Sequence, residues 1–192
     1  MKVIGIAFSD LHLGEYSKFN EDNKRTLNHI RVLYLIKDLC IKYKCPAFFC
    51  GDFMHRPEFI STSLDEIIIE QFEELNRCEE FNIYGISGNH DLQKSNTIER
   101  RSSSHWANLC RRYSFLHNID FSYHDFGKFR VVGIPYIDHN KGLDSLIKAE
   151  LKGAMLKPTI LLLHTDYPGA KDTDNTEVGT VENLNVNLLT KF

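Results

Sequence analysis

Three short apolar runs alternate with two amphipathic segments in the first half of the chain. Lys2 to Ser9 and Pro46 to Cys50 contain short apolar runs typical of buried strands, and Phe81 to Ile86 is predicted to form a third strand. Between them, Asn23 to Tyr43 and Ser61 to Asn76 carry apolar residues at helical spacing. The order strand, helix, strand, helix, strand predicts an α/β fold built on a parallel sheet.

The second half has a different pattern. Asp120 to Phe126 and Lys128 to Pro135 are predicted to form a hairpin around Gly127. A helix from about Leu143 to Leu151 and a last apolar strand, Thr159 to Leu163, follow. A polar loop and a short terminal helix, residues 181–192, complete the predicted elements. At 192 residues and 42 % hydrophobic content, we expect one domain over residues 1–192.

Composition narrows the class of protein. The formal charge of −3 provides no general electrostatic attraction to nucleic acid, so any DNA contact must be local. Five cysteines, odd in number and without a C-x-x-C pair, favour reduced thiols, and no secretory signal is recognisable, so we expect a cytoplasmic protein. No apolar run approaches the roughly 20 residues that cross a bilayer, so no membrane association is expected.

Polar side chains with metal-binding chemistry follow directly after the predicted strands. They are Asp10, His12, Asp52, Asn89, His90 and His164. In open α/β sheets, ligands bind at the carboxyl ends of the strands, where these residues are expected to meet. Mixed oxygen and imidazole donors suit Mn, Fe, Zn or Mg. Two ions roughly 3.5–4 Å apart need a bridging carboxylate, terminal ligands and a shared hydroxide, and these residue types meet that requirement.

The order and spacing of Asp10-Leu11-His12, Gly51-Asp52, Gly88-Asn89-His90-Asp91 and His164 resemble the signature of the calcineurin-like metallophosphoesterases. The resemblance implies a β-sandwich flanked by helices. It also implies that Asp10 and His12 hold one ion, that Asp52 bridges two ions, and that Asn89 and His164 hold the second.

The resemblance further implies catalytic roles. His90 would lie beside the ions, unbound, and would stabilise the transition state or protonate the leaving oxygen, with Asp91 orienting its imidazole. The segment from Gly51 to His55 is similar to a motif of the nuclease subunit of SbcCD-type DNA-repair complexes, in which His55 would contact the scissile phosphodiester. We therefore expect a DNA phosphodiesterase that uses two divalent ions, Mn²⁺ foremost, as a homodimer with an SbcC-like ATPase.

The family normally ends its site with a Gly-His-x-His segment, and no such segment follows the predicted terminal helix. We therefore expect a chain that is truncated before its last strands, with each ion short of one ligand. His105, His117, His124 and His139 have no spacing that marks them as replacements. Two other readings stay open: a phosphoesterase acting on nucleotides or other small molecules, and a non-catalytic interaction module of the same fold.

Overall fold

The computed structural model describes residues 2–14, 24–55, 60–92, 104–137 and 157–165. Two sheets form in this part of the chain. The first is entirely parallel and has the order β1 (Ile6–Phe8), β2 (Ala47–Phe49), β3 (Ile83–Gly85) and β4 (Leu116–Asn118). The second contains β5 (Ser122–Asp125), antiparallel to β6 (Arg130–Ile134), which pairs in parallel with β7 (Thr159–Leu163).

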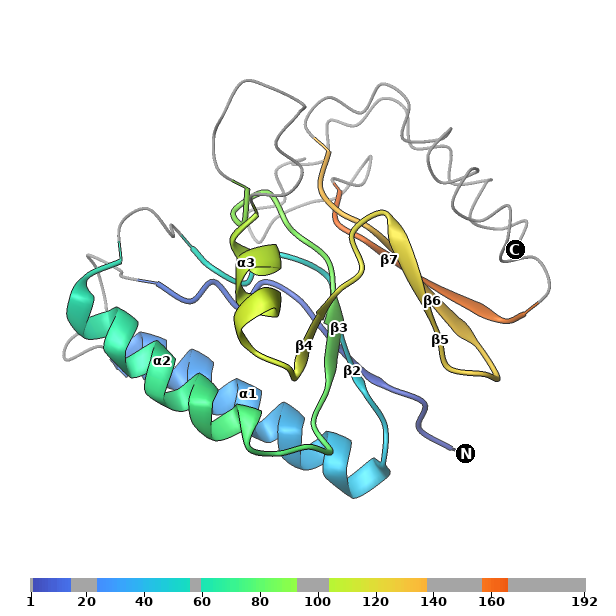
Figure 1. Ribbon diagram of the computed structural model, residues 1–192, viewed down its shortest axis with the longest axis horizontal. Helices are drawn as coiled ribbons and strands as arrows, with labels where there is room; N and C mark the ends of the chain where they lie inside the picture. The colour runs from blue at the N-terminus through green and yellow to red at the C-terminus, as the bar shows by residue number, and fades with distance from the viewer. Residues whose placement is uncertain (1, 15–23, 56–59, 93–103, 138–156, 166–192) are drawn as a thin grey trace, which may run out of the picture.

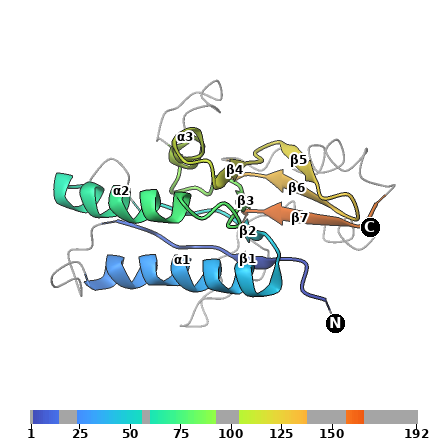
Figure 2. The ribbon, with the colours of Figure 1, turned by 60° about the horizontal axis from the view of Figure 1, so that its bottom comes forward.

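Three helices accompany the sheets: α1 (Lys24–Tyr43), α2 (Thr62–Asn76) and α3 (His105–Arg112). Figure 1 and Figure 2 show α1 and α2 side by side, with the β5–β7 sheet on the other side of the β1–β4 sheet. A hydrogen bond from the Tyr34 hydroxyl to Gln71 Oε1, 3.1 Å long, joins the two long helices. The α/β fold with parallel and mixed sheets flanked by helices is therefore as the sequence predicted.

Burial on both faces explains the apolar run of β2, whereas β1, at the edge of the sheet, is only half-buried and leaves Ala7 exposed, so the prediction of a buried first strand was wrong. In β2, Ala47 and Phe49 belong to the core beneath the helices, whereas Phe48 packs in the core between the two sheets. All three side chains are buried. Each fully buried large apolar side chain contributes roughly 1.5–3 kcal/mol. A strand in this position must be apolar at every residue, because neither face meets water.

The fourth strand of the parallel sheet was not expected. β4 contains one apolar residue and two polar ones, Leu116 and then His117 and Asn118, so it produces no apolar run. Its place follows from α3, which precedes it and packs on the sheet through the fully buried Trp106. The indole Nε1 donates to the Gly85 carbonyl at 3.0 Å, which ties α3 to β3.

The other predicted elements within the described residues form with small shifts of their ends, including the hairpin whose turn contains Gly127 at φ 79°. The predicted helix at 143–151, the polar loop and the terminal helix lie outside the described residues. Within the described residues, no helix is both long enough and apolar enough to cross a membrane.

Candidate metal centre

Backbone pairing brings the loops after β1 and β2 together. The N–H of Asp10 donates to the Gly51 carbonyl and the N–H of His12 to the Asp52 carbonyl, each at 3.0 Å. Asp10, His12 and Asp52 all adopt left-handed backbone conformations, with φ of 55°, 46° and 62°. Such conformations cost of order 1–3 kcal/mol each for residues other than glycine, and they cluster at functional sites. The fold therefore holds these three residues in backbone conformations that they would not favour in an unfolded chain.

Asp52 lies at the middle of the centre. Its Oδ2 is 3.6 Å from His12 Nε2 and 3.6 Å from His164 Nε2, so one carboxylate oxygen faces an imidazole on either side. Asp10 Oδ1 is also 3.6 Å from His12 Nε2. The Asp52 side chain is only 5 % exposed, whereas that of Asp10 is 57 % exposed. This is the arrangement expected of a bridging carboxylate with a terminal ligand on each side.

The hydrogen bonds around His164 leave acceptor atoms facing one another. His164 Nδ1 donates to the Cys50 carbonyl at 2.7 Å, so the ring carries its lone pair on Nε2. Asn89 Oδ1 lies 2.9 Å from that nitrogen, and Asp52 Oδ2 lies 3.6 Å from it. Turning the Asn89 amide would replace these contacts by hydrogen bonds from its NH₂ group to His164 and Asp52. With the Asn89 amide oxygen facing His164, three acceptors converge in a way that fits a cation, and the carboxylate and imidazole donors of this centre suit a divalent ion.

The protonation state of His12 also suits a ligand. Burial lowers the pKa of His12 below its ordinary value, and the nearby Asp52 carboxylate opposes this shift without reversing it. A neutral imidazole is the form that binds metal ions. A cavity of about 460 Å³ opens over the centre, and its lining includes Asp10, Asp52, Asn89 and His164.

His90 is anchored by its backbone and by one ring nitrogen. Its N–H donates to Asp52 Oδ1 at 2.9 Å, and its Nδ1 donates to the His55 carbonyl at 2.8 Å. The His55 and His90 rings stack, with centroids 5.5 Å apart and an interplanar angle of 19°. Because Nδ1 is engaged by the carbonyl, Nε2 is the nitrogen that His90 can direct at a substrate.

Asp91 does not make the contact with the His90 ring that the resemblance implied. Its two oxygens accept the backbone N–H groups of Asp52, Phe53, Met54 and Gly88 at 2.9–3.2 Å. Burial raises the pKa of Asp91 to about 6, and the backbone N–H bonds to its oxygens oppose the rise. The Asp91 side chain therefore joins the loops after β2 and β3, because N–H donors from both loops bind its carboxylate. We call this contact the Asp91 clamp.

Two glycines allow the loops to approach. A Cβ on Gly88 would lie 2.1 Å from Asp52 Oδ1 and 2.3 Å from the Asp52 nitrogen. A Cβ on Gly51, whose φ is 104°, would lie 2.4 Å from His164 Nδ1. Any larger residue at either position would displace Asp52 or His164.

The structure thus brings together all the predicted ligands: Asp10, His12, Asp52, Asn89 and His164. Their roles as ligands stay predictions. Sequence reasoning missed Asp120, which accepts from the N–H and the hydroxyl of Ser87 at 2.8 and 2.6 Å and so holds the start of the His90 loop. No sequence motif marks Asp120. Tyr136, whose ring centroid is 6.2 Å from that of His164, lines the cavity. Tyr136 lies just after β6, and this position at a strand end is the sequence feature that could have marked it.

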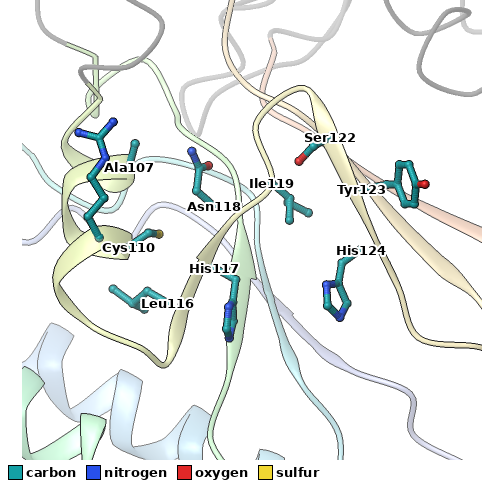
Figure 3. Close-up of a pocket in the computed structure, with 10 residues that line it drawn as sticks. Ala107, Cys110, Leu116, His117, Asn118, Ile119, Ser122, Tyr123 and His124 are labelled. Carbon is teal, nitrogen blue, oxygen red and sulfur yellow. The ribbon is translucent and has the colours of Figure 1, made fainter.

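Two of the histidines considered as replacement ligands lie away from this centre. His117 and His124 line a second cavity of about 520 Å³, between α3, β4 and β5 (Figure 3). The His117 ring stacks on Tyr84 with centroids 4.4 Å apart, and the His124 ring packs on it at a tilt of 40° with centroids 4.3 Å apart. His117 Nε2 is 2.7 Å from Asn82 Oδ1. Their packing explains their presence without a metal. His139 lies outside the described residues.

Comparison with known proteins finds a family and two solved structures to which this chain is similar. The family model for calcineurin-like phosphoesterases matches residues 6–189. A putative 5'-nucleotidase from Staphylococcus aureus, solved in complex with alpha-ketoglutarate, superposes with a TM-score of 0.54 at 16 % identity, covering 98 % of this chain and 42 % of that one. A nuclease MPE from Pseudomonas putida gives a TM-score of 0.40 at 15 % identity, covering 71 % of this chain and 56 % of that one.

The likeness to the nucleotidase shows a shared fold. The chain spans about half the length of these solved relatives. No curated protein sequence matched the chain.

Proposed function

The chain belongs to the calcineurin-like phosphoesterase family, and on that premise we propose that it is a two-metal phosphodiesterase acting on DNA. The observation that carries the proposal is the position of Asp52 Oδ2, 3.6 Å from one imidazole on each side. Asp10 and His12 would hold one ion, Asn89 and His164 the other, and Asp52 both. The chemistry supplied at such a centre, when ions are bound, is polarisation of a phosphoryl oxygen and activation of water.

The chain's own residues would prepare the substrate for this chemistry. The bond from His90 Nδ1 to the His55 carbonyl fixes the ring, so that a protonated His90 can donate from Nε2 to the leaving oxygen. Such a donor contributes typically ~10²–10⁴-fold in rate. The Asp91 clamp holds the loops of Asp52 and His90 together, because the Asp91 carboxylate accepts hydrogen bonds from N–H groups in both loops.

The preference for DNA rests on His55 and on the resemblance to the repair nucleases. His55 stacks on His90, with its ring centroid 5.7 Å from that of His12, so it lies at the rim of the proposed reaction site. A histidine there can hydrogen-bond a phosphodiester oxygen and position the scissile bond. With the same resemblance as the basis, we propose Mn²⁺ as the working ion, and a homodimer that associates with an SbcC-like ATPase.

The test is incubation of the full chain with Mn²⁺ and end-labelled linear DNA, in parallel with a nucleoside monophosphate and with bis(p-nitrophenyl) phosphate. We expect metal-dependent release of labelled fragments, lost on addition of a chelator and reduced about 100-fold in His90→Asn. Hydrolysis of the monophosphate with DNA left intact would instead favour the nucleotide phosphoesterase. If no phosphoester is cleaved and no Mn²⁺ is bound, the non-catalytic module is the better description.

A further inference from the structure

Three half-buried imidazoles form a second group beside the mixed centre. His12, His55 and His90 each offer a ring nitrogen, and these atoms all lie within 4.8 Å of one another. The ring centroids are 4.8 Å apart for His12 and His90, 5.5 Å for His55 and His90, and 5.7 Å for His12 and His55. In contrast to the group of Asp10, His12 and Asp52, this group offers nitrogen donors alone.

Backbone hydrogen bonds hold the three residues on one framework. The N–H of His55 donates to the Leu13 carbonyl at 2.7 Å, and the N–H of His12 donates to the Asp52 carbonyl at 3.0 Å. His90 is joined to both neighbouring loops, through its N–H to Asp52 Oδ1 and through Nδ1 to the His55 carbonyl. A ligating histidine commonly donates its other ring N–H to a backbone carbonyl, and His90 already does so.

We propose that His12, His55 and His90 form a separate three-histidine site for a divalent ion that prefers nitrogen donors, zinc foremost. Zinc accepts three histidines and a water in tetrahedral geometry, with Zn–N distances of about 2.0–2.1 Å. Ligand nitrogens in that geometry are ~3.4 Å apart, so nitrogens that lie within 4.8 Å of one another must close by at most about 1.4 Å, which is within the reach of side-chain rotation. Mn²⁺ and Mg²⁺, which favour oxygen donors, have no comparable reason to enter it.

Occupation of this site opposes the phosphoester chemistry. The site takes His12 from the mixed centre, and it occupies Nε2 of His90, the atom that would otherwise donate a proton to the substrate. This inhibitory consequence rests on the proposed function, whereas the binding of zinc does not. The chain therefore contains two overlapping metal sites that share His12. The site around Asp52 is rich in oxygen donors, and the site that includes His55 offers nitrogen donors alone.

The experiment compares Zn²⁺ and Mn²⁺ affinities of the full chain by competition with a metal-binding dye. His55→Ala removes a ligand of the three-histidine site and leaves Asp10, Asp52 and His164 in place. We expect Zn²⁺ affinity to fall at least about tenfold and Mn²⁺ affinity to change less than about twofold. His124→Ala, which removes a half-buried histidine of the second cavity, is the matched control and should change neither affinity.

Equal affinities of wild type and His55→Ala for zinc would overturn the proposal, and so would equal losses for both metals. His55→Asn, closer in size to histidine, repeats the test if the alanine variant unfolds. In the activity arm, micromolar Zn²⁺ should inhibit Mn²⁺-dependent hydrolysis of bis(p-nitrophenyl) phosphate by the wild type. If zinc binds as described and no preparation hydrolyses the ester, the phosphoesterase assignment fails and the zinc site stands.

Discussion

Replacing Gly88 by alanine tests the close contact between the β2 and β3 loops. The added Cβ would lie 2.1 Å from Asp52 Oδ1 and 2.3 Å from the Asp52 nitrogen, where ordinary contacts are 3.4–4 Å. One of these atoms is backbone, so rotation of the Asp52 side chain cannot relieve the overlap. The loops must separate by about 1 Å. Overpacking of this kind costs typically 1–3 kcal/mol of stability.

The larger effect is expected on the metal centre. Asp52 Oδ2 is 3.6 Å from both His12 and His164, so a shift of Asp52 changes both sides of the centre at once. A misplacement of about 1 Å can cost ~100-fold in rate. We expect Gly88→Ala to lower Mn²⁺-dependent hydrolysis of bis(p-nitrophenyl) phosphate by about that factor and to weaken Mn²⁺ binding.

Gly127→Ala is the matched control. A Cβ there meets no heavy atom within 4 Å, but the φ of 79° strains any residue other than glycine, by roughly 1–2 kcal/mol. Denaturant unfolding should therefore show comparable destabilisation of the two variants, while only Gly88→Ala loses metal binding and activity. Normal Mn²⁺ binding by a folded Gly88→Ala variant would refute the inference that Asp52 is the shared ligand.

Three further perturbations test the framework. Asp91→Asn leaves one or two backbone N–H groups without an acceptor, so denaturant unfolding should show a loss of about 1–3 kcal/mol, together with reduced Mn²⁺ affinity. Ser104→Ala removes the N-cap of α3, which should cost about 1 kcal/mol and raise amide exchange in its first turn. Lys157 beside Asp125 lowers the pKa of that carboxyl to about 2. This contribution is complete above about pH 4 and lost as the pH falls to about 2, so Asp125→Asn should flatten acid unfolding in that window.

Each of these has a result that would count against it. Unchanged stability of Asp91→Asn would mean that the clamp is redundant. Unaltered exchange in Ser104→Ala would mean that Trp106 packing alone starts α3. A carboxyl titration of Asp125 near pH 4 by NMR would show that the contact with Lys157 does not persist in solution.

Local sequence patterns were sufficient to predict those helices and strands in which burial follows a regular pattern along the chain. The apolar run in β2 predicted its burial on both faces, and the helical spacing in α1 and α2 predicted their position over the sheet. β4 escaped because two of its three residues are polar, so it produces no apolar run, and its place in the sheet depends on α3 and β3 beside it.

The sequence by itself determined which residues could serve a metal centre, because the carboxyl ends of parallel strands must meet at one edge and polar residues follow each of those strands. Only the tertiary structure decided how they are used. It directed Asp91 to four backbone N–H groups instead of the His90 ring, and it placed His55 against His12 and His90 as a nitrogen-only group. The direction of each side chain depends on which hydrogen-bond donors of the neighbouring loops lie within reach. The order of residues along the chain does not reveal those distances.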